Sequence, residues 1–243
     1  MAEPSGIIAA CTSYLESYLD GDAERMASCL HPALVKRCAV NPGDEDLALE
    51  ETDFDEMTGV AVAGGPKAIG RTSEITILDA LDDIATAKVL SEPFVDLVNL
   101  ARFGDRWLIV DALYQRRPGA DATGDPGPVT DAINGYAASW FDADRSLAAS
   151  VVHPHLAERR TRPSPGNPLA LEATTFEELL EIATDGPDEP LPRAWTAEVL
   201  DRSGDIAVGK VVMAWFDLYP LLVRAGERWM IVNILYRSRW TAA

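Results

Sequence analysis

The stretch GDRWLIV at residues 104–110 returns as GERWMIV at residues 226–232, which lies 122 residues further along the chain. The same offset relates three more pairs of segments: residues 14–22 and 136–144, 31–34 and 153–156, and 49–54 and 171–176. No insertion or deletion interrupts this register, so the loops of the two copies have equal lengths. The sequence therefore predicts one small folding unit that is encoded twice.

The length of the chain agrees with two units. Its 243 residues suffice for two domains of ordinary size. Residues 118–128 are rich in Pro, Gly, Ala and Asp, a composition that is typical of a linker. We therefore expect a first repeat over residues 1–117, then this linker, then a second repeat over residues 129–243.

Each copy is predicted to form helices first and strands afterwards. Apolar residues recur at helical spacing from Ile7 in the first copy and from Val129 in the second. Asp22 and Asp144 are candidate N-caps of a second helix. The proline of each His-Pro pair should bring that helix to an end.

A third helix is expected from Thr52 in the first copy and from Thr174 in the second. Thr174 and Glu177 fit a capping box, and the first copy has a weaker version with Asp in place of Glu. Gly64 and Gly186 should end this helix.

Four strands should follow in the first copy, over residues 74–78, 83–91, 94–103 and 106–115, with equivalents 122 residues later. Gly104-Asp105 and Gly226-Glu227 have the Gly-X form of a two-residue hairpin turn. Helices followed by an antiparallel meander give the α+β class, in which the helices pack on one face of a curved antiparallel sheet.

Apolar residues occupy both faces of the strand that is predicted at residues 216–223. One face should pack against the helices, so the other face needs a second cover. The sheet of the other copy is the economical candidate, because like surfaces related by an approximate twofold are self-complementary. We therefore expect an intramolecular pseudo-dimer and a monomeric chain.

The net charge restricts the kind of partner. It is −18, and a surface that acidic repels phosphate backbones and anionic lipid headgroups, which disfavours nucleic acid and membrane. No apolar run reaches the ~18 residues of a spanning helix, so we expect a cytoplasmic protein. The sequence has no nucleotide-binding loop, dinucleotide fingerprint, nucleophile elbow or zinc-ligand spacing. The expected partner is a small-molecule ligand, with no cofactor and no metal.

The order of motifs in each copy resembles a known family. A helix, an acidic turn, His-Pro, the run from ILD to DIATAKV at residues 77–89, GDRWLIV and a late Leu-Tyr are similar to the NTF2-like proteins that are labelled lumazine-binding. The resemblance to SnoaL-like cyclases is looser. The resemblance to the NTF2-like proteins implies two cone-shaped α+β barrels with interior pockets, paired through their sheets. The superfamily includes isomerases, dehydratases, hydrolases, cyclases and proteins without known activity, so the resemblance implies no single reaction.

Asp96 and Asp217 are candidate catalytic residues because they lie on strands rich in apolar residues. Asp96 follows Phe94 by two residues whereas Asp217 follows Phe216 by one, so in a shared register they point to opposite faces. A carboxylate on an apolar strand would serve as a general base for proton abstraction or water activation. The alternative is an ion pair with a neighbouring arginine.

Four candidate catalytic helpers recur in both copies: His31, His153, Tyr14 and Tyr136. Each histidine precedes a proline at a predicted helix end, where an imidazole either stabilises the fold by bonding a free carbonyl or acts as a base. The candidate ligand-binding residues are Arg37, Arg159, Trp107, Trp229, Tyr18 and Trp140. The arginines would clamp an anionic oxygen or pair with carboxylates, and the aromatic residues would line a pocket or fill the core.

Three functions stay open at this point. The first is a cofactor-free pocket protein for a small, partly apolar metabolite, acting as an acid–base isomerase, lyase or cyclase through a strand Asp. The second is a non-catalytic binder, and the third is a scaffold whose cavity is filled by its own side chains. Residues that serve a ligand need appear in only one copy, and the second copy has the larger aromatic residues. We therefore expect the working cavity in the first copy, with Asp96 facing inward.

Overall fold

The computed structural model describes residues 4–64, 73–117, 125–162, 164, 166–185 and 192–239. The chain divides into two compact units, and over these described residues each is an α+β fold of three helices and six strands. This confirms the tandem organisation. Residues 118–124 of the expected linker and Gly186 lie outside the described residues.

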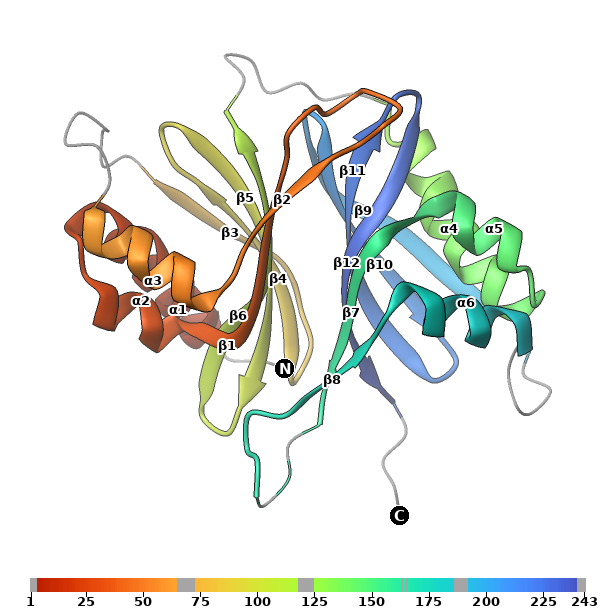
Figure 1. Ribbon diagram of the computed structural model, residues 1–243. Coiled ribbons are helices and arrows are strands. Elements are labelled where there is room, and N and C mark those ends of the chain that lie inside the picture. Colours follow the sequence, from red (N-terminus) through yellow and green to blue (C-terminus); the bar gives the residue numbers. More distant parts are fainter. Residues whose placement is uncertain are drawn as a thin grey trace. The chain divides into compact units, whose positions relative to one another are not determined.

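The same order of elements builds both units (Figure 1). Unit 1 contains α1 (Pro4–Asp20), α2 (Ala23–Cys29), β1 (Leu30–Ala39), β2 (Leu49–Thr52), α3 (Phe54–Ala63), β3 (Glu74–Ala80), β4 (Ile84–Leu90), β5 (Phe94–Phe103) and β6 (Arg106–Arg116). Unit 2 contains α4 (Gly127–Phe141), α5 (Arg145–Val151), β7 (Val152–Thr161), β8 (Leu171–Thr174), α6 (Phe176–Asp185), β9 (Trp195–Ser203), β10 (Ile206–Met213), β11 (Phe216–Ala225) and β12 (Arg228–Ser238).

Each sheet is mixed rather than antiparallel. The strand order is β2-β1-β6-β5-β4-β3 in unit 1 and β8-β7-β12-β11-β10-β9 in unit 2. β1 runs parallel to β6, and β7 runs parallel to β12. The sequence patterns predicted neither of these strands, because each His-Pro pair was placed at a helix end, and they did not predict the short strands β2 and β8 either. Each helix instead ends three residues before the proline, and the His-Pro pair already lies within the strand. A proline disfavours the helical conformation of the residue before it, which agrees with an extended chain at the histidine.

The helix ends follow the expected capping chemistry with one change of position. The side chains of Asp22 and Asp144 cap α2 and α5, as predicted. The third helix begins one residue later than expected. Asp53 forms a reciprocal capping box with Glu56 in α3, and Thr175 does so with Glu178 in α6. Gly64 ends α3 at a φ of 69°, a value that favours glycine.

The helices of each unit cover one face of its own sheet (Figure 1). The core of unit 1 joins α1 residues such as Ile7 and Cys11 to sheet residues such as Val98 and Ile109. The corresponding core of unit 2 joins Ile133 of α4 to Leu222 of β11. The hairpin turns at Gly104 and Gly226 form as predicted, with φ values of 68° and 60°.

Each unit also includes a short segment that the other repeat encodes. Unit 1 contains Arg162–Ala170, and unit 2 contains Asn41–Ala48. In unit 1, Nε2 of His31 lies 2.8 Å from the carbonyl oxygen of Leu169. In unit 2, Nε2 of His153 lies 3.3 Å from the carbonyl oxygen of Leu47. The two histidines therefore hold equivalent positions in the two units.

The pairing of the two repeats through their sheets stays a prediction. Among the described residues, no helix is both long enough and apolar enough to cross a membrane.

Candidate functional site

A cavity of about 150 Å³ lies between the helices and the sheet of unit 1. Its wall is largely apolar and contains a small group of polar side chains. The lining residues are Tyr14, Leu15, Tyr18, Leu19, Lys36, Thr52, Met57, Val60, Ser91, Pro93, Phe94, Asp96 and Tyr114. An apolar cavity with a few convergent polar groups is the usual form of a small-molecule site.

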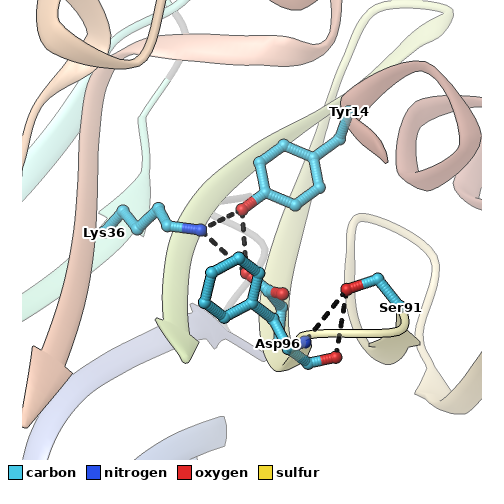
Figure 2. A network of polar contacts seen from close by, with 5 residues as sticks. Tyr14, Lys36, Ser91 and Asp96 are labelled. Atoms are coloured by element: carbon cyan, nitrogen blue, oxygen red, sulfur yellow. Dashed lines mark hydrogen bonds and ion pairs between the residues drawn. The ribbon is translucent and has the colours of Figure 1, made fainter. Parts of the chain in front are cut away.

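Three of these polar groups form a buried network (Figure 2). The hydroxyl group of Tyr14 donates a hydrogen bond to Oδ1 of Asp96 at 2.8 Å. Nζ of Lys36 lies at the same distance from Oδ1, and it also donates to the hydroxyl group of Tyr14. The side chains of Lys36 and Asp96 are 11% and 7% exposed, so this ion pair is largely removed from water.

Three different elements bring the network together. Asp96 on β5 stands directly opposite Tyr114 on β6. Lys36 comes from β1, which pairs with the other edge of β6, and its ammonium group lies 4.1 Å from the ring centroid of Tyr114. Tyr14 comes from the buried face of α1. The site therefore depends on the parallel pairing of β1 with β6, because that pairing places Lys36 beside Asp96.

The protonation of the tyrosines follows from their surroundings. Burial raises the pKa of Tyr14 well above its ordinary value, and the nearby Asp96 carboxylate raises it further. Burial raises the pKa of Tyr114 to about 12. Both hydroxyl groups therefore stay protonated at neutral pH. The hydrogen bonds to Asp96 reach Oδ1, and no described residue hydrogen-bonds to Oδ2.

Unit 2 contains the equivalent cavity with different chemistry. Its volume is about 100 Å³, and its lining residues are Tyr136, Trp140, Glu158, Thr174, Leu179, Ile182, Met213, Phe216, Leu218 and Tyr236. Glu158 stands where unit 1 has Lys36, and Leu218 stands where unit 1 has Asp96. The hydroxyl group of Tyr136 donates a hydrogen bond to Oε1 of Glu158 at 2.7 Å. Burial raises the pKa of Glu158 to about 7.

Five of the residues that the sequence analysis singled out line these cavities: Tyr14, Tyr18 and Asp96 in unit 1, and Tyr136 and Trp140 in unit 2. Asp217 does not line the cavity of unit 2. It is buried on β11, where its carboxylate accepts hydrogen bonds from Arg237 at 2.9 Å and from Arg239 at 2.6 Å. It takes the arginine-paired arrangement that was the alternative to a catalytic role.

The two histidines contact the backbone instead of a cavity. Nδ1 of His31 accepts a hydrogen bond from the backbone N–H of Ala33, so Nε2 carries the hydrogen and donates it to Leu169. His153 makes the same contact with the N–H of His155. These bonds tie the start of each parallel strand to the segment from the other repeat.

The remaining ligand-binding candidates also lie outside the cavity linings. Arg37 is buried and pairs with Glu51 on the neighbouring strand, with an N–O distance of 2.9 Å. Arg159 is buried at the equivalent place on β7. Trp107 and Trp229 are buried members of the two cores. In the described part of the chain, no group of three or more His, Cys, Asp or Glu side chains could hold a metal ion.

Lys36 and Glu158 are the site residues that the sequence analysis missed. They occupy the same position of the repeat and carry opposite charges. The charge reversal accompanies the replacement of Asp96 by Leu218, and this paired difference is visible in the sequence. A comparison of the copies at positions 36 and 158 would therefore have found both residues.

Comparisons with known proteins agree with the repeat. The model of the family described as "Putative lumazine-binding" matches residues 2–115 and again residues 125–237. An NTF-2 like protein from Silicibacter pomeroyi is 22% identical, with 46% of this chain and 94% of that chain covered and a TM-score of 0.40. An NTF2-like protein from Methylobacillus flagellatus is 23% identical, with 47% and 91% covered and a TM-score of 0.39. No curated protein sequence matches the chain significantly.

Proposed function

The chain belongs to the "Putative lumazine-binding" family and is a tandem pair of NTF2-like units, and from this premise we propose that the cavity of unit 1 binds a small, partly apolar molecule and transfers a proton on it. The observation that carries the proposal is the buried network of Tyr14, Lys36 and Asp96 in the wall of the larger cavity. An ion pair in an apolar site is costly to bury, so its position beside an open cavity favours a role in recognition or catalysis.

Asp96 is the group that would accept the proton. Tyr14 and Lys36 hold Oδ1, which leaves Oδ2 to a ligand. A C–H bond beside a carbonyl group would give its proton to Oδ2, and the electron pair of that bond would stay on the ligand as an enolate. The ammonium group of Lys36 would offset the enolate charge. Return of the proton to another atom would complete an isomerisation without a cofactor.

A simple ketone tests both parts of this proposal. Cyclohexanone in D₂O exchanges its α-hydrogens for deuterium when a base removes them, and ¹H NMR follows the loss of their signal. We expect the protein to accelerate the exchange in a saturable manner. Asp96→Asn should lower the catalysed rate about 100-fold, because general bases typically contribute a factor of that order or more.

Asp217→Asn is the matched control, since Asp217 is equally buried but pairs with Arg237 and Arg239 away from the cavity. The folded Asp217→Asn protein should retain the exchange rate. Saturable broadening of the ketone signals without exchange would limit the function to binding. Equal losses in the two folded variants would remove Asp96 from its assigned role.

A further inference from the structure

Unit 1 shows how an ammonium group sits in the cavity that both units share. Nζ of Lys36 lies 4.1 Å from the ring centroid of Tyr114 and 5.0 Å from that of Tyr14. Both distances are within the ~6 Å range of cation–π attraction. The carboxylate of Asp96 completes the surroundings of this cation at 2.8 Å. The cavity of unit 1 therefore carries its own cation, supplied by β1.

Unit 2 keeps the aromatic rings but not the lysine. The guanidinium group of Arg160 lies 5.9 Å from the ring centroid of Tyr236, and it pairs with Glu172 instead of Glu158. Tyr136 and Tyr236 stand at the positions of Tyr14 and Tyr114, and the position of Lys36 is taken by Glu158. A tryptophan, Trp140, replaces Tyr18, and its indole ring attracts cations more strongly than a phenol ring.

The rings of unit 2 form an angular wall. Trp140 and Phe216 meet edge to face, with centroids 6.1 Å apart and planes at 82°. Phe216 and Tyr236 meet in the same manner at 5.7 Å. Aromatic rings at steep angles around one point are the arrangement with which proteins recognise alkylammonium groups.

Glu158 supplies a negative charge without a cationic partner. It is 5% exposed, and its one hydrogen bond among the described residues comes from Tyr136. No Lys, Arg or His of the described chain forms an ion pair with it. Burial raises its pKa, and the hydrogen bond from Tyr136 offsets only part of that rise. A buried carboxylate normally has a positive partner, so this cavity lacks the charge that unit 1 provides for itself.

We propose that the cavity of unit 2 binds small organic cations, such as primary or methylated amines, with the ammonium group among Tyr136, Trp140 and Tyr236 and paired with Glu158. The ammonium group of the ligand takes the place that the ammonium group of Lys36 fills in unit 1. The two repeats thus have different specificities, one for a carbonyl compound whose C–H bond meets Asp96 and one for an amine. This site is independent of the proton transfer that is assigned to unit 1.

Ethylammonium chloride is a suitable probe, and ethanol is its uncharged counterpart. The indole N–H signal of Trp140 reports occupancy in an NMR titration at about pH 8.5, where Glu158 is ionised. We expect saturable shifts with ethylammonium, no such shifts with the same concentration of sodium chloride, and binding of ethanol weaker by about tenfold or more. Comparable affinities for ethylammonium and ethanol would overturn the proposal.

Two variants locate the binding. Glu158→Gln keeps an acceptor for Tyr136 but removes the charge, and it should weaken ethylammonium binding by about tenfold or more. Glu158→Lys combined with Leu218→Asp gives unit 2 the polar side chains of unit 1, including a built-in ammonium group, and should abolish the binding. If the first variant failed to fold, the second would still test the proposal. Unchanged affinity in either folded variant would contradict it.

Discussion

Lys36 and Glu158 show how two substitutions change the chemistry of one fold. In unit 1 the buried charges are balanced within the cavity, because Lys36 pairs with Asp96. In unit 2 both members of the pair have changed, and the carboxylate of Glu158 is bonded to Tyr136 alone among the described residues. Replacing Lys36 alone would leave the Asp96 carboxylate without a positive partner, and replacing Asp96 alone would leave the Lys36 ammonium group without a negative one. The two positions should therefore be energetically coupled.

A double-mutant cycle measures this coupling in unit 1. Lys36→Met and Asp96→Leu should each lower the free energy of unfolding by about 3 kcal/mol or more, because each leaves one buried charge without its partner. The double variant has an apolar wall at both positions and should lose much less than the sum of the two single losses. Urea unfolding gives all three values. Additive losses would show that the ion pair contributes nothing as a pair.

Glu158 should make the stability of unit 2 depend on pH. Its pKa rises from the ordinary 4.5 to about 7, so between these values the folded protein holds a proton that the unfolded chain has released. The free energy of unfolding therefore falls as the pH rises through this window, and the loss is complete above about pH 7. At 1.36 kcal/mol per pKa unit, the total loss is about 3 kcal/mol.

The facing groups do not titrate in this window. Tyr136 on α4 has a pKa well above 10, and burial raises that of Tyr236 on β12 to about 12. Urea unfolding of the protein and of Glu158→Gln at about pH 5 and about pH 8.5 isolates the effect. The variant should gain about 3 kcal/mol relative to the parent between the two conditions. A constant difference would mean that Glu158 titrates normally.

At the scale of elements, β1 and β7 explain what the sequence did and did not predict. The helices, the four-strand meander and the hairpin turns follow from local patterns of apolar residues and glycine. The two parallel strands do not, because they contain a proline and buried charged residues such as Lys36 and Arg37, and only pairing with β6 or β12 makes them strands. Asp96 was recognised because it lies on a strand rich in apolar residues, while Lys36 was missed along with its strand.

The start of the third helix was misplaced for a different reason. Two adjacent residues could cap it in each copy, and the sequence analysis took the first. The glutamates that complete the boxes, Glu56 and Glu178, lie three residues after Asp53 and Thr175. In the first copy this spacing favours Asp53, because the residue three positions after Thr52 is Asp55. In the second copy Thr174 and Thr175 each have a glutamate three positions later, so the spacing does not distinguish them.

His31 should stabilise β1 more than it serves the cavity. Its ring accepts a hydrogen bond from Ala33 and donates one to Leu169, and glutamine cannot span both contacts. His31→Gln should therefore cost about 1–2 kcal/mol, or a few degrees in the melting temperature. Calorimetry measures the loss, and cyclohexanone exchange should be retained. Full stability together with lost exchange would instead assign His31 to the site.

For the whole molecule, the two segments encoded by the opposite repeats are the notable feature. Asn41–Ala48 belongs to unit 2, where the backbone N–H of Gly43 donates to the carbonyl oxygen of Arg224 at 3.0 Å. Glu45 there lies so close to Gly226 that an added Cβ would approach its side chain at 3.2 Å. Arg162–Ala170 belongs to unit 1, where it receives the bond from His31. Each unit is therefore incomplete without a segment from the other half of the sequence.

This exchange of segments between the repeats predicts that a change in one repeat lowers the stability of the other unit. Replacing residues 42–47 with a Gly-Ser segment of equal length, in the full chain, should weaken unit 2 although the change lies in the first repeat. Replacing residues 164–169 in the same manner should weaken unit 1. Each replacement removes hydrogen bonds and packing from the unit that contains the segment. In the other unit it changes only the composition of a connecting loop whose length is preserved.

Hydrogen exchange with mass spectrometry separates the two units, because peptides from β5 report on unit 1 and peptides from β11 report on unit 2. The first replacement should speed the exchange of β11 by about tenfold or more, as expected for a loss of ~1.4 kcal/mol or more, and affect β5 less. The second should do the reverse. If each replacement instead weakened mainly the repeat in which it was made, the two segments would stabilise the repeats that encode them. The placement of each segment in the other unit would then have no energetic role.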